Sequence, residues 1–197
     1  GFTGTLDGSK THKWVLEGLF GECEQVTKTD DLIKDGYLSK FRIKVLLCKH
    51  APQHFESYHD EMEYLVEHKG RNNLIKNLVN DLEGNTLVLF NYVEKHGDPL
   101  YELINSTIDP ERKLFFVHGG TDVEDREEVR QITETESNAI IVASYGTFST
   151  GINIKRLHNI VFASPSKSRI RNLQSIGRVL RKGEGKDIAT LYDIADD

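Results

Sequence analysis

The chain has 197 residues and a net charge of −6, and 38% of its residues are hydrophobic while 28% are charged. This composition fits a folded protein of one domain or two small ones, and it excludes a mainly disordered chain. No apolar run approaches the roughly 18–20 residues that span a bilayer, and the first residues lack the pattern of a secretory signal. The two cysteines, Cys23 and Cys48, form no C-x-x-C pair, so we expect a reducing compartment such as the cytoplasm.

Charge is distributed unevenly along the chain. Residues 155–186 hold nine lysines and arginines but only one acid, a net charge of +8, which leaves −14 for the rest of the chain. An acidic body that carries one basic segment predicts a focused site for an anionic partner.

Apolar runs alternate with helical patterns along most of the chain. We expect helices over residues 12–20, 54–69, 71–83, 92–106, 122–136 and 168–180, and strands over 41–48, 86–91, 114–118, 139–144, 159–164 and 189–194. A capping box at Thr121–Glu124 predicts the start of the fifth helix. Because the apolar runs are continuous, the strands should be buried on both faces. The order predicts an α/β fold, a parallel sheet with helices on both faces.

Polar residues follow several of these runs. In open α/β sheets, ligands collect at the carboxyl ends of the strands. Asn91, His118-Gly119-Gly120, Ser144 and Ser164–Ser168 each follow a predicted strand. Hydroxyls, glycines and backbone N–H groups at such ends suit phosphate oxygens, although each loop taken alone is more typical of an ordinary turn.

The predicted helix 168–180 has a more specific pattern. Arg171, Gln174, Arg178 and Arg181 fall within about 80° of one another on a helical wheel, and the apolar residues lie opposite. One face therefore packs on the sheet while the other presents three guanidinium groups. Lysine would serve a solvated surface equally well, so the use of arginine alone favours phosphate binding.

Two other patterns are weaker. Residues 4–11 resemble a phosphate-binding P-loop, but Ser9 stands where a glycine is required, and too few residues precede it for the necessary strand. The histidines within residues 50–59 could suggest a metal site, but Pro52 interrupts the helical face that two of them would share. We therefore expect neither a P-loop nor a bound metal ion in this chain.

Four segments resemble motifs of superfamily 2 helicases, in the right order and spacing. Residues 174–181, Q-S-I-G-R-V-L-R, resemble motif VI, and residues 144–153 resemble motif V. Residues 86–91 resemble motif IV, and Thr3-Gly4-Thr5 resembles motif III, with Gly4 in place of the usual Ala. The resemblance covers essentially the whole chain and is greatest to phage helicases that remodel branched DNA. It implies a RecA-like fold, the second motor domain of such a helicase.

The resemblance implies a role for each matching residue. Arg178 and Arg181 match the motif VI arginines that contact the γ-phosphate of ATP, one of them as the arginine finger. It also implies nucleotide binding by Gln174, Gly177, Gly151 and Asn153, coupling between motor domains by Thr3, Gly4 and Thr5, and contact with the DNA backbone by Asn91 and Ser144. Asn153 stands where the family commonly has Asp. The strand-end and helix-face arguments add His118, Gly119 and Arg171 as DNA contacts.

The resemblance also implies parts that this chain does not carry. A first RecA-like motor domain would hold ATP with Mg²⁺ through its P-loop and acidic box. We expect residues 1–50 to be the end of that domain and the connection, 51–83 a helical linker region and 84–197 the RecA-like domain. The boundary would lie earlier than residue 84 if the strand 41–48 joins the same sheet.

The intact protein would then be an ATP-dependent helicase that unwinds or branch-migrates branched DNA in recombination, repair and replication. Its DNA would be branched or single-stranded, and its compartment the host cytoplasm if the protein comes from a phage. This chain alone should not hydrolyse ATP. Two alternatives stay open: a nucleic-acid-binding or annealing module without enzymatic activity, and a translocase subunit of a restriction enzyme.

Overall fold

The computed structural model describes residues 9–24, 26–150, 154, 156–166, 172, 175–177, 179–183 and 186–197, without the side chains of residues 149 and 150. Its centre is a sheet of six parallel strands in the order β1-β6-β5-β2-β4-β3. The strands are β1 (Lys40–Cys48), β2 (Thr86–Phe90), β3 (Leu114–Val117), β4 (Ile140–Ser144), β5 (Asn159–Phe162) and β6 (Ile188–Asp196). The predicted parallel sheet is confirmed, and every predicted strand is found.

The helices of the described residues are α1 (Lys10–Phe20), α2 (Thr29–Lys34), α3 (Tyr58–Glu67), α4 (Lys69–Asp81), α5 (Asp98–Asn105), α6 (Val123–Thr135) and α7 (Tyr145–Thr150). Residues 172, 175–177 and 179 are also helical. The single helix predicted over 92–106 is instead a π-helical turn, η1 (Val93–Gly97), followed directly by α5. None of the described helices is long and apolar enough to cross a membrane.

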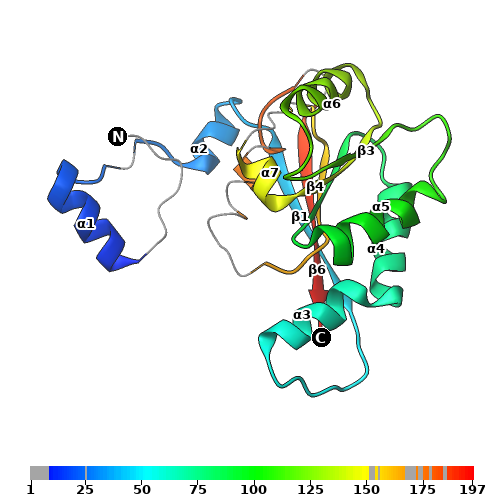
Figure 1. Ribbon diagram of the computed structural model, residues 1–197. Helices are drawn as coiled ribbons and strands as arrows, with labels where there is room; N and C mark the ends of the chain where they lie inside the picture. The colour runs from blue at the N-terminus through cyan, green and yellow to red at the C-terminus, as the bar shows by residue number, and fades with distance from the viewer. Residues whose placement is uncertain are drawn as a thin grey trace.

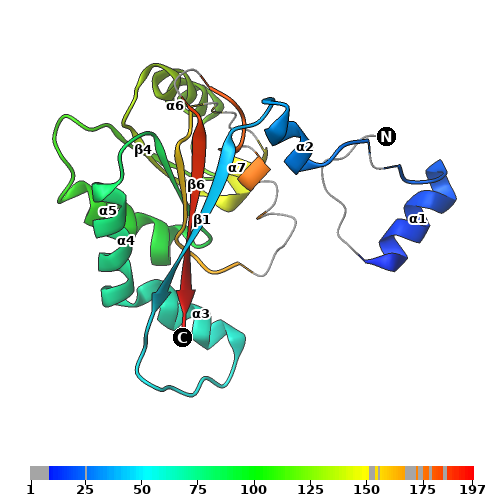
Figure 2. The same cartoon turned by 180° about the vertical axis from the view of Figure 1, so that it is seen from behind.

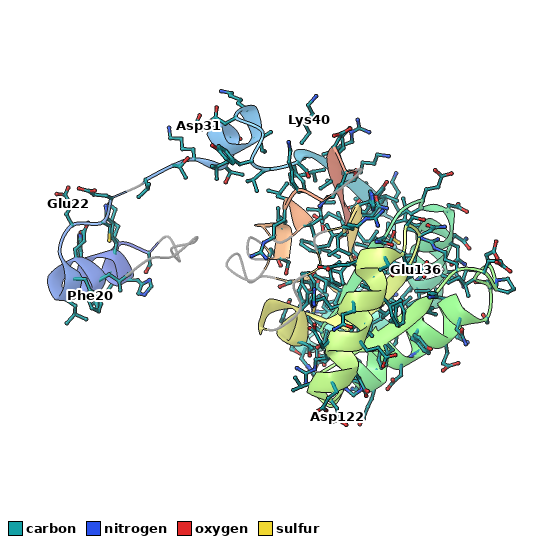
Figure 3. All side chains as sticks on the ribbon, turned by 90° about the horizontal axis from the view of Figure 1, so that it is seen from above. Phe20, Glu22, Asp31, Lys40, Asp122 and Glu136 are labelled. Atoms are coloured by element: carbon teal, nitrogen blue, oxygen red, sulfur yellow. The ribbon has the colours of Figure 1, made fainter. Side chains whose placement is uncertain are left out.

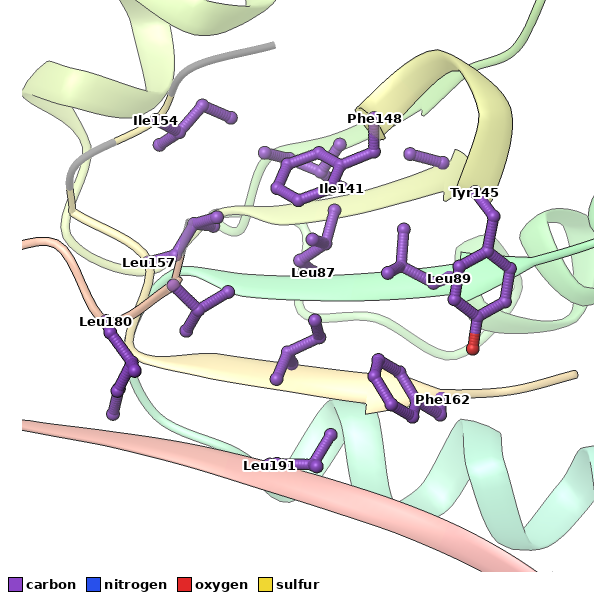
Figure 4. Packing of buried hydrophobic residues seen from close by; sticks show 14 of the residues in the cluster. Leu87, Leu89, Ile141, Tyr145, Phe148, Ile154, Leu157, Phe162, Leu180 and Leu191 are labelled. Carbon is purple, nitrogen blue, oxygen red and sulfur yellow. The ribbon is translucent and has the colours of Figure 1, made fainter. Parts of the chain in front are cut away.

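Helices cover both faces of the sheet, as predicted (Figures 1 and 2). On one face, α4 and α5 pack against alternate residues of the central strands, among them Val88, Phe90 and Val142. On the other face, Leu87, Leu89 and neighbouring strand residues pack against α6, α7 and the side chains of Ile176, Val179 and Leu180 (Figure 4). The strands β2 and β5 are buried throughout, because both of their faces are covered.

The predicted capping box at Thr121–Glu124 is wrong. Helix α6 begins one residue later, with Asp122 as its N-cap and without a capping hydrogen bond from that side chain. The Thr121 hydroxyl instead accepts from the backbone N–H of His118 at 3.0 Å and closes the turn that precedes the helix. Figure 3 shows α6 between Asp122 and Glu136.

Strand β1 belongs to the same sheet as the later strands. Strand β1 pairs with β6 along its whole length, and Ile75 and Val79 of α4 lie fully buried in the core. The predicted strand 41–48 thus joins the sheet, which is the condition under which we expect the boundary to lie earlier than residue 84. By contrast, α1 has no buried residue and stands apart from the sheet (Figures 1 and 3).

Strand β1 forms one edge of the sheet. On one face of this strand, Ile43, Val45 and Leu47 are each more than half exposed. Lys40, Arg42 and Lys44 alternate with them on the other face, and the Lys44 ammonium lies 5.3 Å from the centre of the Tyr192 ring. The edge is thus apolar on one side and basic on the other.

Candidate functional site

The carboxyl ends of the parallel strands meet at one edge of the sheet, which we call the carboxyl edge. Phe90 of β2 pairs with Ser144 of β4, so Asn91 lies beside Ser144, as the sequence predicts. Ser164 follows β5 on the other side of β2, and His118 follows β3 beyond β4. Amide, hydroxyl and imidazole groups therefore follow one another along this edge, with Ser164 buried among them.

Asn91 is fixed by contacts with the segment that follows β5. Its backbone N–H donates to the Ser164 hydroxyl at 3.0 Å, and its side-chain amide donates to the carbonyl oxygen of Pro165 at 3.0 Å. The Ser164 carbonyl oxygen accepts from the Tyr145 hydroxyl of α7 at 3.4 Å. Three neighbouring strand ends are thus linked by hydrogen bonds.

His96 of η1 lies beneath this group and is fully buried. Its Nδ1 lies 2.7 Å from the Ser164 hydroxyl, and its Nε2 lies 3.1 Å from the side-chain oxygen of Asn72 in α4. Burial, with a smaller contribution from the charge of Arg71, lowers the pKa of His96 to about 3. The imidazole is therefore neutral at physiological pH.

Ser144 and His118 have structural contacts of their own. The Ser144 hydroxyl donates to the Thr147 hydroxyl at 2.8 Å and accepts from the Thr147 N–H at 3.3 Å, which is the geometry of a helix cap for α7. Nδ1 of His118 accepts from the N–H of Gly120 at 3.1 Å. Arg126 of α6 donates to the carbonyl oxygen of Gly119 at 3.2 Å, so this loop is held from the helix that follows it.

Arg181 lies near the amino-terminal ends of the strands, opposite the carboxyl edge. Its backbone forms an isolated bridge with Leu38, directly before β1 begins, and its side chain is exposed. The buried Lys186 ammonium donates to the carbonyl oxygens of Val179 and Arg181, the latter at 2.8 Å. Burial lowers the pKa of Lys186 to about 8. The end of the basic segment is therefore anchored through its backbone, and Arg181 itself is exposed.

An ionic network lies at the carboxyl ends of β1 and β6. The fully buried Arg71 of α4 donates through Nε to both carboxylate oxygens of Asp196, at 2.8 and 3.1 Å, and through a terminal nitrogen to the carbonyl oxygen of Ala163 at 2.5 Å. His50 Nε2 lies 2.9 Å from the same carboxylate. We call these residues the Arg71–Asp196 network.

Within the described residues, His50 does not group with the other histidines of the 50–59 segment. Side-chain atoms of Cys48, His50 and Asp196 instead come within 4.8 Å of one another. Arg71 already occupies both oxygens of that carboxylate, and its positive charge opposes a cation at the same place. Burial and the charge of Asp196 raise the pKa of Cys48, which disfavours the thiolate that binds metals.

The structure describes some of the predicted site residues. It describes Asn91, His118, Gly119, Ser144, Gly177 and Arg181, whereas Thr3, Gly4, Thr5, Gly151, Asn153, Arg171, Gln174 and Arg178 lie outside the described residues. A Cβ atom at Gly177 would meet nothing within 4 Å, so no described neighbour requires glycine there. The predicted DNA contacts that are described, Asn91, His118, Gly119 and Ser144, share the carboxyl edge, and Arg181 is separated from them by the length of the sheet.

The fold and these motifs define a class. The chain belongs to the helicase conserved C-terminal domain family, which matches residues 70–183. The predicted RecA-like fold, the second motor domain of a helicase, is thereby confirmed.

One relative is similar to the chain along its whole length. The chain is 36% identical over 205 aligned residues to the ATP-dependent DNA helicase UvsW of Enterobacteria phage T4, with all of this chain aligned. The crystal structure of T4 UvsW superimposes with a TM-score of 0.68 at 32% identity, over 95% of this chain and 37% of that one. The chain thus spans 40% of the length of this curated relative.

A second structure shares the fold alone. A fragment of a putative HsdR subunit of a type I restriction enzyme from Vibrio vulnificus YJ016 gives a TM-score of 0.73 at 16% identity. It covers 98% of this chain and 38% of that chain. At this identity the likeness shows a common architecture and says nothing of a common substrate.

Proposed function

We propose that this chain is the C-terminal motor half of an ATP-dependent helicase that unwinds or branch-migrates branched DNA. The similarity to UvsW along the entire chain supports the helicase class and a DNA substrate. Roles in recombination, repair and replication, and a place in the cytoplasm of a phage-infected cell, follow from the same proposal.

The observation that carries the proposal is the separation of two kinds of group. The exposed Arg181 follows an anchored backbone at the amino-terminal ends of the strands, while neutral amide and hydroxyl groups line the carboxyl edge beside β5, β2 and β4. A guanidinium held in this way suits the phosphates of a nucleotide that a facing domain positions. Neutral groups suit a nucleic-acid backbone that must be contacted and then released. We assign the first edge to ATP and the second to DNA.

The carboxylates in the described part of the site do not fit a magnesium ion. Asp193 and Asp196 both interact electrostatically with Arg71, and both carboxylate oxygens of Asp196 accept from its Nε. Mg²⁺ takes carboxylate oxygens in a nearly octahedral shell, together with water and phosphate. We therefore expect the metal to be held by a first motor domain, and this chain to contribute the arginines and one wall of the nucleotide cleft.

The test compares Arg181→Ala with Lys182→Ala in the intact protein that contains this chain. Both substitutions remove one positive charge from adjacent, exposed positions, so the second is a matched control. Loss of an arginine finger should lower the rate of ATP hydrolysis by roughly 10³–10⁵-fold while ATP and DNA binding persist, because the finger acts on the transition state. Lys182→Ala should hydrolyse ATP normally.

Other outcomes favour the alternatives. Normal hydrolysis by Arg181→Ala would remove the finger role from this residue and leave Arg178 as the remaining motif VI candidate. A simple binding module instead predicts weaker DNA binding and no effect linked to ATP. Robust hydrolysis by residues 1–197 alone would contradict the need for a first motor domain.

A further inference from the structure

A directed chain of hydrogen bonds runs from α4 to Asn91. The Asn72 amide nitrogen donates to the carbonyl oxygen of Val66 at 2.8 Å, so its side-chain oxygen is the acceptor toward His96. Nε2 of His96 must then carry the proton, which leaves Nδ1 as an acceptor. The Ser164 hydroxyl donates to Nδ1, and its oxygen accepts from the N–H of Asn91.

We call these four residues, Asn72, His96, Ser164 and Asn91, the relay. With a neutral imidazole, each donor in the relay faces an acceptor. A neutral imidazole donates at one nitrogen and accepts at the other. A charged imidazole would donate at both, which would leave the Ser164 O–H proton without its acceptor on Nδ1. His96 and Ser164 are buried, so a lost bond in the relay would not be replaced readily by water. The position of Ser164 is thereby tied to the tautomer of His96.

The π-helical turn places His96 where the relay needs it. The N–H of Gly97 donates to the carbonyl oxygen of Tyr92 at 2.8 Å, which is the five-residue spacing of a π-helix. A Cβ atom on Gly97 would lie 2.5 Å from the ring of Phe90, so the turn is pressed directly onto the end of β2. The same strand end carries Asn91.

We propose that His96 is a positioning residue that, through Ser164, sets the backbone of Asn91 for contact with the nucleic acid. This inference rests on the proposed role of Asn91 at the carboxyl edge. His96 itself is buried and touches no ligand; it fixes the orientation of the group that does. The relay also ties this strand end to α4, because Asn72 holds the far side of the imidazole.

Two substitutions of His96 separate positioning from simple stability. Asparagine can place its amide oxygen near the site of Nδ1 and keep an acceptor for Ser164, whereas glutamine can place its amide nitrogen near Nε2 and keep only the contact with Asn72. In the intact protein, His96→Gln should weaken DNA binding roughly 3- to 10-fold, the worth of about one hydrogen bond, while His96→Asn stays near wild type. Both should keep their affinity for ATP.

Two further variants complete the design, all at a temperature where unfolding curves show each protein folded. Ser164→Ala cuts the relay beside Asn91 and should reproduce the loss seen with His96→Gln. Asn72→Ala cuts the far end and should lower stability with little effect on DNA affinity. If DNA affinity follows stability across all four variants, His96 is a structural residue and the inference is overturned.

Asn91→Ala, measured alongside, distinguishes the inference from the proposed function beneath it. Unchanged DNA affinity in this variant would overturn both. Weaker binding by Asn91→Ala together with equal affinities of the two His96 variants would overturn the inference alone. Proton–nitrogen correlation spectra of ¹⁵N-histidine-labelled protein give a readout independent of DNA: a proton on Nε2 supports the relay, and a proton on Nδ1 contradicts it.

Discussion

The carboxyl edge has two halves, the ends of β1 and β6 and the ends of β5 and β2, and different contacts support them. Beneath β1 and β6, the Arg71–Asp196 network buries a full ion pair, whereas beneath β5 and β2 the contacts of Ser164, His96 and Asn72 are all between neutral groups. Consecutive residues of α4, Arg71 and Asn72, hold the two halves. A buried ion pair gives a fixed and costly anchor, because neither charge can be left alone. Neutral groups can be held close to a polyanion without adding charge to the surface that it meets.

The two halves also interact. Burial is the main cause of the low pKa of His96, and the charge of Arg71 lowers it further, so the charged half adds to what keeps this imidazole neutral. The four predictions that follow test this contrast, beginning with the largest expected effect.

Removal of the buried guanidinium should be the most damaging change. Arg71→Met would leave the Asp196 carboxylate without its partner, and we expect a loss of about 3–5 kcal/mol in the free energy of unfolding. Urea unfolding at pH 7 measures this loss, with Lys69→Ala on the exposed face of the same helix as the control. A loss below about 1 kcal/mol, in the range of surface pairs, would show that the network is not the anchor described here.

Acid should act on the neutral half through His96. The folded pKa of about 3 lies below the ordinary value of 6.5, so at lower pH the unfolded chain binds a proton that the native state refuses. The resulting stability is complete above pH 6.5 and is lost as the pH falls toward 3, by about 1.4 kcal/mol for each pH unit. Unfolding curves between pH 7 and 4 should show this slope in the wild type and a smaller one in His96→Asn; parallel slopes would contradict the assignment.

Gly97 tests how tightly η1 is packed on β2. Gly97→Ala places a methyl group against the Phe90 ring, and we expect a loss of about 1–3 kcal/mol from overpacking. Phe90→Leu in the same protein should recover part of that loss by making room. As a control, Gly119→Ala meets nothing within 4 Å and should stay within about 0.5 kcal/mol of wild type. Equal stabilities of the two alanine variants would show that the contact yields easily.

The smallest effects concern the DNA contacts themselves. Asn91→Ala and Ser144→Ala should each weaken DNA binding roughly 3- to 10-fold with little change in nucleotide binding. Because both side chains are neutral, the salt dependence should keep its slope, on the order of one to three released ions for this chain alone. Salt-titrated affinities test this, with the exposed Asn73→Ala as control. Unchanged affinity in both variants, or a strong preference for one base sequence, would place the DNA elsewhere.

The sequence predicts the strand ends better than the buried residues that support them. The strands β2, β4 and β5 are identified by continuous apolar runs, because burial on both faces excludes alternation. Asn91 and Ser144 are found because polar residues that directly follow such runs must lie at one edge. Both inferences depend on neighbours in the chain.

The supporting residues have no such local signal. His96 contacts partners 24 and 68 residues away, and Arg71 reaches Asp196 across 125 residues. An arginine in a polar helix is ordinarily expected at the surface, so its complete burial follows only from the tertiary fold. The π-helical turn is hidden for a similar reason, since the sequence of η1 and α5 has the ordinary pattern of a single helix.

Strand β1 has a practical consequence for work with this chain alone. An edge strand has backbone donors and acceptors that can pair with another extended segment. Next to this edge, the exposed Ile43, Val45 and Leu47 provide apolar side chains that such a segment can cover. Lys40, Arg42 and Lys44 oppose such pairing because two copies would bring like charges together. Salt weakens their repulsion. High protein concentration at high ionic strength should therefore favour edge-to-edge pairing of β1 between molecules, and low protein concentration at low ionic strength should disfavour it.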